Sequence, residues 1–217
     1  MPKVHPDAAD PSPAAEHQEE PPPAVLTVWR KSLLFNCDGF TVFDANGDLA
    51  FRVDCYGSGR HTEVVLMDAA GKPLLTVRRK RSLLALEHWV IYDGDAAAAG
   101  KAKPLLSVRR HVSLQRSSNK TLAHVTPVAA SAAADFVVEG SYGRRACAVR
   151  DARGDAVVAQ VQRKESPVGD EVFRLVVDPR LGAALAMGLV IALDEMFRGG
   201  GGVRGAARSL LRRTWSV

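Results

Sequence analysis

Two short runs of basic residues are the part of this sequence with the clearest chemical potential. Residues 78–120 contain ten Lys or Arg residues and three acidic ones. A local excess of positive charge attracts anions such as phospholipid head groups or nucleic-acid phosphates. The residues that we expect to bind an anionic lipid are Arg78, Arg79, Lys80, Arg81, Arg109 and Arg110. The alternative is that these are solvated turn residues.

The position of these runs follows from the strands before them. Each run comes directly after an apolar stretch that ends in a valine, Val77 or Val108. Neighbouring residues of a strand point to opposite faces, so consecutive cations cannot all lie in mid-strand beside a filled core. We therefore expect both runs at strand ends on the rim of the domain, where they could form one patch.

The C-terminal segment is a second candidate for contact with a membrane. The last twenty residues hold five Arg and no acidic residue. Arg204, Arg208 and Arg212 recur every four residues, and Leu211 and Trp215 fall four apart on a different side. This spacing predicts a short basic amphipathic helix at a membrane interface. The alternative is a frayed tail, because a helix this short is marginal in water.

Residue patterns typical of enzymes and metal sites are missing. The six His residues are scattered, and the three Cys residues form no CxxC pair. The sequence has no GxSxG motif. Residues 200–205 fit GxGxxG, but they follow a predicted helix and indicate a flexible hinge. We therefore predict a protein without enzymatic activity, metal or cofactor.

Short strands separated by turns dominate from Val25 to Val177. The pattern Asp-Ala-x-Gly recurs three times, beginning at Asp44, Asp68 and Asp151. Asp hydrogen-bonds the backbone that follows it, and Gly supplies a positive φ, so each repeat predicts a β-hairpin. Further strands are predicted at 62–67, 89–92, 105–109, 136–139, 146–149 and 172–177. This spacing predicts a mostly β domain, either a sandwich or a barrel.

One helix is predicted near the C-terminus, over residues 179–197. Asp178-Pro179 is typical of a helix start, because Asp caps the first turn and Pro fits the first helical position. The run Leu181 to Leu193 is uncharged and apolar on every face, so the helix must be buried on all sides. Its thirteen residues fall short of the roughly 20 that a membrane span needs. The natural place for it is inside a closed antiparallel sheet.

Residues across the chain also resemble the plant LURP-one-related family. The resemblance covers roughly residues 25–197 and rests on Trp29-Arg30-Lys31-Ser32, Asp38-Gly39-Phe40, Leu66-Met67-Asp68, Tyr92-Asp93-Gly94-Asp95 and Leu193-Asp194-Glu195. It implies a Tubby C-terminal-like fold, a barrel of about twelve antiparallel strands around a central hydrophobic helix, shared with phospholipid scramblases. It also implies a membrane-tethered or phosphoinositide-binding regulator that is linked to plant defence.

These observations divide the chain into three segments. Residues 1–24 are acidic and rich in Pro and Ala, which predicts disorder, residues 25–197 form the barrel domain, and residues 198–217 are a Gly- and Arg-rich tail. We expect an intracellular monomer, cytoplasmic or nuclear, without a transmembrane span and peripheral at the plasma membrane. Anionic lipid head groups are the expected partner; a nucleic acid and an unidentified protein are the alternatives.

Overall fold

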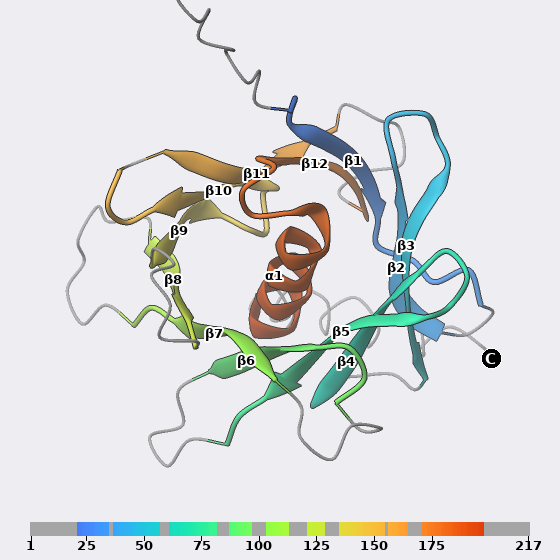
Figure 1. Cartoon of the computed structure of the whole chain (residues 1–217), viewed down its shortest axis with the longest axis horizontal. Coiled ribbons are helices and arrows are strands. Elements are labelled where there is room, and N and C mark those ends of the chain that lie inside the picture. The colour runs from blue at the N-terminus through green and yellow to red at the C-terminus, as the bar shows by residue number, and fades with distance from the viewer. Residues whose placement is uncertain are drawn as a thin grey trace, which may run out of the picture.

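A closed barrel with a helix inside it forms the described part of the chain (Figure 1). The computed structural model describes residues 21–34, 37–56, 61–81, 87–96, 103–112, 121–128, 135–154, 156–164 and 171–197. The strands are β1 (Ala24–Trp29), β2 (Cys37–Phe43), β3 (Leu49–Tyr56), β4 (Glu63–Asp68), β5 (Pro73–Arg79), β6 (His88–Asp93), β7 (Pro104–Arg110), β8 (Thr121–Pro127), β9 (Phe136–Ser141), β10 (Ala146–Asp151), β11 (Val157–Arg163) and β12 (Val172–Val177). The helix is α1 (Ala183–Phe197). The predicted antiparallel barrel around a C-terminal helix is confirmed.

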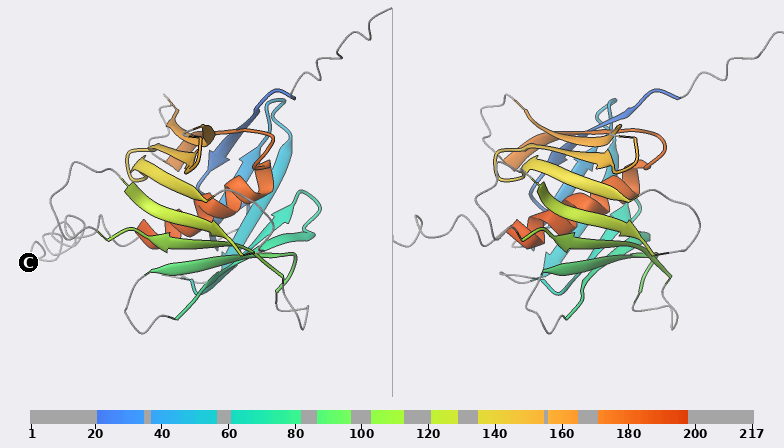
Figure 2. Two further views of the ribbon diagram at one scale, coloured as in Figure 1. Left: turned by 60° about the vertical axis from the view of Figure 1, so that its left-hand side comes forward. Right: turned by 90° about the vertical axis from the view of Figure 1, so that its left-hand side faces the viewer.

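The barrel has two different ends, because consecutive strands run antiparallel around it and β12 closes onto β1. The connections that leave the even-numbered strands lie at one end. The helix α1 follows β12, so it starts at this end, which we call the entry rim. The connections that leave the odd-numbered strands lie at the other end, where α1 terminates at Phe197, and we call this end the exit rim. Figure 2 shows α1 running between the two ends.

The core forms where inward-facing strand residues meet α1. Every residue from Ala186 to Met196 is buried. The strands contribute fully buried side chains such as Trp89, Leu66 and Phe173. A Cβ on Gly188 would lie 3.2 Å from Cδ1 of Ile91, so the missing side chain lets the helix approach the wall closely. Each large apolar side chain buried here contributes about 1.5 to 3 kcal/mol, which fixes the helix along the barrel axis.

The predicted helix start at 179–180 is wrong. Asp178 begins a turn instead: its carboxylate accepts a hydrogen bond from the backbone N–H of Arg180 at 2.9 Å. Gly182 has a φ of +79°, and its carbonyl accepts the first helical hydrogen bond, from the N–H of Ala186 at 3.1 Å. The chain must reverse between β12 and the barrel interior, and the turn uses the residues that resemble a helix cap.

The three Asp-Ala-x-Gly repeats lie in hairpins at the entry rim, as predicted. Gly47 and Gly71 have φ values of +90° and +86°. Gly154 has no positive φ, and the third turn is longer by one residue, since Asp151 bonds to Ala156 whereas Asp44 bonds to Asp48. The expectation of a positive φ therefore fails at the third repeat, because the extra residue changes how the turn closes.

The predicted strands all appear, β1 is additional to them, and so is β8. Its seven residues alternate between less exposed and more exposed positions along part of their length, but they include His124 and end at Pro127. A polar histidine and a proline, which has no N–H to donate to the ladder, weaken the strand pattern.

In the described part of the chain, no helix has the length and apolar content needed to cross a membrane.

Candidate functional site

The two rims of the barrel carry different charges. The exposed cations at the exit rim are Lys31, Arg79, Lys80, Arg81, Arg109, Arg110, Arg144, Arg163 and Lys164. Aspartates gather at the entry rim, namely Asp44, Asp48, Asp68, Asp93, Asp95, Asp135, Asp151 and Asp178. Among the residues that the structure describes, the entry rim has fewer cations: Lys72, Lys103, Arg153 and Arg180. The charge excess therefore points out of one end of the barrel, where it creates a field that attracts anions.

The two predicted basic runs meet at the exit rim. Both β5 and β7 end there, on either side of the first residues of β6. The backbone N–H of Lys80 donates to the carbonyl of His88 at 2.8 Å, and His88 pairs with Arg109 in the adjoining ladder. Trp89 and Val108 point inward and are buried, so His88 and Arg109 point outward. Lys80, His88 and Arg109 therefore form one row on the outer wall.

This row lies at the head of a groove on the outside of the barrel. The groove has a volume of about 350 Å³. It is lined by Lys80, His88, Val90, Tyr92, Pro104, Ser107, Arg109, Thr126, Pro127 and Val128. We call it the outer groove. Two cations, an imidazole and hydroxyl groups share this lining, which is a donor set suited to a phosphate group.

His88 lies at the head of the outer groove, between Lys80 and Arg109. Its Nε2 lies 2.9 Å from Oγ of Ser107. Partial burial lowers the pKa of His88 below its ordinary value of 6.5, and the charges of Arg109 and Lys80 lower it further. The imidazole is therefore neutral at pH 7, and an anion between the two cations would raise its pKa again.

A pair of histidines extends the same face. Arg109 pairs with His124 on β8, and Nε2 of His124 lies 3.0 Å from Nδ1 of His111. At this distance an N–H of one ring donates a hydrogen bond to the ring nitrogen of the other. Among the described residues, no group of three or more His, Cys, Asp or Glu side chains could hold a metal ion.

The six predicted lipid-binding residues are not equivalent. Arg78 is paired with Glu63, and Arg79 lies 3.2 Å from Glu87. The guanidinium of Arg110 stacks on the ring of Phe197, 4.8 Å from its centroid. Lys80, Arg81 and Arg109 form no ion pair with a carboxylate of the described residues. These three are the cations best able to exchange water for an external anion.

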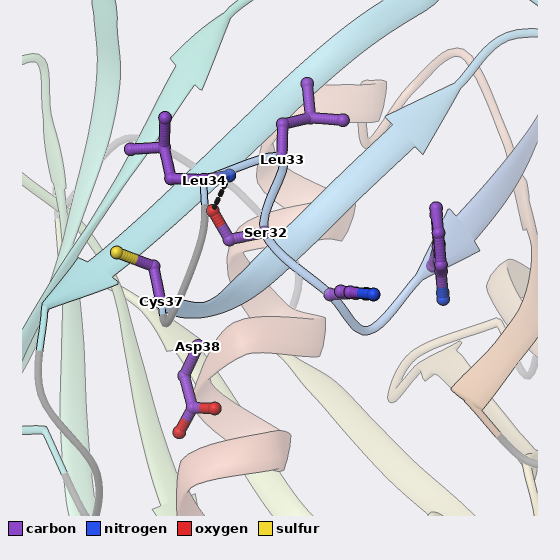
Figure 3. Close-up of a pocket in the computed structure, with 7 residues that line it drawn as sticks. Ser32, Leu33, Leu34, Cys37 and Asp38 are labelled. Atoms are coloured by element: carbon purple, nitrogen blue, oxygen red, sulfur yellow. Dashed lines mark hydrogen bonds between the residues drawn. The ribbon is translucent and has the colours of Figure 1, made fainter.

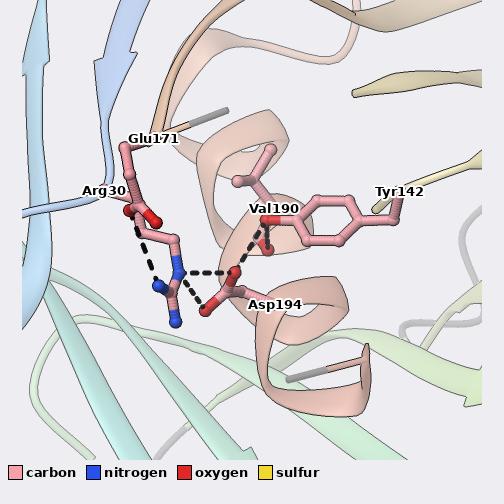
Figure 4. A network of polar contacts seen from close by, with 5 residues as sticks. All are labelled: Arg30, Tyr142, Glu171, Val190 and Asp194. Carbon is pink, nitrogen blue, oxygen red and sulfur yellow. Dashed lines mark hydrogen bonds and ion pairs between the residues drawn. The ribbon is translucent and has the colours of Figure 1, made fainter. Parts of the chain in front are cut away.

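A partly buried ionic network with Asp194 at its centre lies beneath the exit rim (Figure 4). Nε of Arg30 donates to both carboxylate oxygens of Asp194, at 3.0 and 3.1 Å. The hydroxyl of Tyr142 donates to Oδ1 of Asp194 at 3.2 Å, and Glu171 lies 3.6 Å from Arg30. Asp194 is buried, and the paired cation is what makes its charge tolerable there. The network links the β1–β2 connection to the end of α1.

The ionisable groups around this network are held in fixed states. Burial lowers the pKa of Arg30, but the attraction and hydrogen bonds of Asp194 outweigh it and raise the pKa above its ordinary value. Burial, together with the charge of Asp194, raises the pKa of Tyr142 well above 10. Burial also raises the pKa of Cys147 to about 12, which leaves a poor nucleophile. The network therefore stabilises the fold and does not exchange protons near neutral pH.

Sequence reasoning missed both the buried pair and the outer groove. A signal for the pair was present, because Asp194 and Glu195 directly follow an apolar helical run and would need a partner. No sequence signal could identify Arg30 as that partner, since the two lie 164 residues apart. The predicted tail residues Arg204, Arg208, Arg212 and Trp215 lie outside the described residues.

Comparison with known proteins places the chain among plant relatives. The sequence profile of the LURP-one-related family matches residues 24–194. Protein LURP-one-related 8 from Arabidopsis thaliana is 43% identical over 205 residues, which cover 91% of this chain and 99% of the relative. Protein LURP-one-related 5 from the same plant is 42% identical over 180 residues, covering 79% of this chain and 82% of the relative.

A solved structure shows the same architecture. An X-ray structure of an Arabidopsis thaliana protein matches with a TM-score of 0.59 and 28% identity, covering 82% of this chain and 93% of the other. The family profile spans the barrel from β1 to the buried Asp194. The chain belongs to the LURP-one-related family.

Proposed function

We propose that this protein is a non-enzymatic regulator that associates with membranes by binding anionic phospholipid head groups, phosphoinositides in particular. The observation that carries the proposal is the convergence of Lys80 and Arg109 on either side of His88 at the exit rim. The two runs are separate in the sequence, and a solvated turn needs no such convergence. The surrounding cations of the exit rim add a field that would draw an anionic surface toward this end.

The outer groove suits a phosphorylated head group better than a nucleic acid. A phosphate could accept from Lys80 and Arg109 at once, with Ser107, which lies beside His88, as a further donor in the lining. The groove also has apolar lining residues, Val90, Pro104 and Val128, and the last two lie toward the entry rim. A nucleic-acid backbone needs a longer track of cations, whereas the flanking Arg78 and Arg79 are paired with carboxylates.

The absence of catalysis is part of the proposal. The names of the relatives denote no enzyme. Cys147 is buried with a pKa of about 12, and Asp194 is occupied by Arg30 and Tyr142. These groups stabilise the barrel, and the exposed chemistry is that of anion binding. A link to plant defence, implied by the resemblance, stays a prediction.

Vesicle co-sedimentation tests the proposal. The wild type should bind phosphatidylcholine vesicles that contain phosphatidylinositol bisphosphate, and it should not bind pure phosphatidylcholine vesicles. Lys80→Gln with Arg109→Gln should weaken binding about 30-fold at low salt, since each cation contributes about 1 kcal/mol near an anionic surface. Raising the salt concentration should mimic the variant. Deleting residues 198–217 tests the proposed contribution of the tail cations.

The matched control is Lys72→Gln with Lys103→Gln, two exposed cations of the entry rim. It makes the same change in net charge, and binding should stay close to that of the wild type. Equal binding to neutral and anionic vesicles, or equal loss in both double variants, would contradict the proposal. Displacement from vesicles by a short DNA duplex at equal phosphate concentration would favour the nucleic-acid alternative instead.

A further inference from the structure

The connection between β1 and β2 exposes two adjacent leucines at the exit rim. Leu33 is 52% exposed and Leu34 is 38% exposed. They line a surface groove of about 660 Å³ together with Trp29, Lys31, Cys37 and Asp38 (Figure 3). Single exposed aliphatic residues are common, but two in succession beside a groove indicate a contact surface.

The segment that carries these leucines is held from beneath. Oγ1 of the buried Thr41 donates to the carbonyl of Lys31 at 2.7 Å. The buried Ser32 donates to Asp54 and accepts from the N–H of Leu34 at 3.0 Å. Arg30, at the start of the segment, is bound to Asp194. Hydrogen bonds therefore fix the segment on its barrel side, and the two leucine side chains stay on the solvent side.

The chemistry beside the leucines matches the surface of an anionic bilayer. The ammonium group of Lys31 lies 5.4 Å from the ring centroid of Trp29 and is exposed. Aliphatic, aromatic and cationic side chains together are typical of segments at a membrane interface. Asp38 is the one carboxylate in the lining, and the exit-rim cations outnumber it. The leucines and these cations face out of the same end of the barrel.

We infer that Leu33 and Leu34 insert into the hydrocarbon layer of an anionic membrane while the exit-rim cations contact its head groups. This inference rests on the proposed function and names its partner more closely. The partner is the bilayer itself, and a soluble phosphorylated head group would satisfy only the cations. The barrel then sits with its exit rim toward the membrane and its aspartate-rich entry rim toward water.

Leucine substitutions separate this inference from the proposed function. Leu33→Ser and Leu34→Ser should each weaken binding to phosphatidylinositol bisphosphate vesicles about tenfold, and together about a hundredfold. Binding of soluble inositol trisphosphate should stay unchanged in the double variant. Val157→Ser is the matched control, since Val157 is 40% exposed at the entry rim and should not contribute. Unchanged melting temperatures would show that all variants fold.

The outcomes are distinct. If the double variant binds vesicles as well as the wild type does, while both bind inositol trisphosphate, the insertion is overturned and the proposed function stands. If the wild type binds neither vesicles nor inositol trisphosphate, the proposed function fails, and the insertion fails with it. If vesicle binding falls together with inositol trisphosphate binding, the leucines act on the anion site and the insertion is also overturned.

A fluorescent probe tests insertion directly. An environment-sensitive dye on Leu33→Cys, with Cys37→Ser removing the one half-exposed cysteine, should shift to the blue on anionic vesicles. Brominated acyl chains should quench it. A dye that is already blue-shifted in buffer and shifts to the red when residues 198–217 are deleted would show that the tail covers the leucines. That result, or no change on vesicles, would overturn the insertion.

Discussion

The two rims of the barrel are built in different ways. At the entry rim the turn aspartates make local contacts: Oδ1 of Asp44 accepts from the N–H groups of Asn46 and Asp48, both at 2.9 Å, and Asp68 accepts from the N–H of Lys72 at 2.8 Å. At the exit rim the buried acidic residues of α1 bind distant residues instead, as in Asp194 with Arg30 and Glu195 with the N–H of His61 at 3.2 Å. These aspartate turns therefore close by themselves, whereas the contacts of Asp194 and Glu195 require the whole fold.

This difference explains where a binding surface could develop. At the entry rim the carboxylates of Asp44, Asp68, Asp151 and Asp178 accept hydrogen bonds within their own turns, so replacing them would destabilise those turns. The cations of the exit rim need not cap a turn, and Lys80 and Arg109 keep their charge available. The buried pair beneath them holds the connections in place. A rigid, cationic end and a self-contained, acidic end result from the same antiparallel topology.

The largest effect should come from breaking the buried pair. Arg30→Met should lower the free energy of unfolding by about 3 to 5 kcal/mol, because it leaves the charge of Asp194 buried without its cation. Adding Asp194→Leu should restore most of the loss, since both charges are then gone. Urea unfolding measures both values. A loss below about 1 kcal/mol in Arg30→Met would show that the exit rim does not depend on this long-range pair.

The stability losses of two glycine-to-alanine variants show how tightly the backbone packs near each rim. A Cβ on Gly39, near the exit rim, would lie 1.9 Å from the carbonyl oxygen of Val53, so Gly39→Ala must displace the backbone. We expect a loss of about 3 kcal/mol or more. Gly47 at the entry rim has a φ of +90° but open space around it, so Gly47→Ala should cost about 1 to 2 kcal/mol. Equal losses of stability for Gly39→Ala and Gly47→Ala in thermal melts would contradict this difference between the rims.

Two titrations give the smallest expected effect. Hydrogen bonds from Arg180, two residues away, lower the pKa of Asp178 at the entry rim to about 2. Arg180→Ala should return it toward 3.8. At the exit rim, burial and the charges of Arg109 and Lys80 lower the pKa of His88. Lys80→Gln should raise this pKa, and inositol trisphosphate should raise it more in the wild type. NMR titration measures each value.

The two groups also affect stability in different pH ranges. The pKa of Asp178 is lowered on folding, so its stabilising contribution is present above about pH 4 and is lost as the pH falls toward 2. The pKa of His88 is lowered too, but a histidine is charged when it is protonated, so folding disfavours its charged form. Its contribution is therefore kept above the unfolded pKa of about 6.5 and lost as the pH falls below it. A His88 pKa above 6.5 without ligand would contradict the electrostatics of the outer groove.

Much of the fold could be predicted from local sequence. The Asp-Ala-x-Gly repeats identify the three hairpins because their hydrogen bonds close within a few residues. The apolar run from Leu181 to Leu193 predicts a fully buried helix, since a helix without a polar face has no other stable position. The start of that helix could not be read in the same way, because Asp178 and Gly182 serve a chain reversal that only the barrel imposes.

The candidate site could be predicted only in part. The sequence by itself determined that cations cluster after Val77 and Val108 and that both runs lie at strand ends. The tertiary structure decided that these ends share one rim, that Lys80 and Arg109 flank His88, and that Arg78 and Arg79 are paired with glutamates. It also decided that Arg30 meets Asp194. The reason is physical: strand alternation and turn chemistry act over a few residues, whereas a barrel brings residues together through the order in which its strands close.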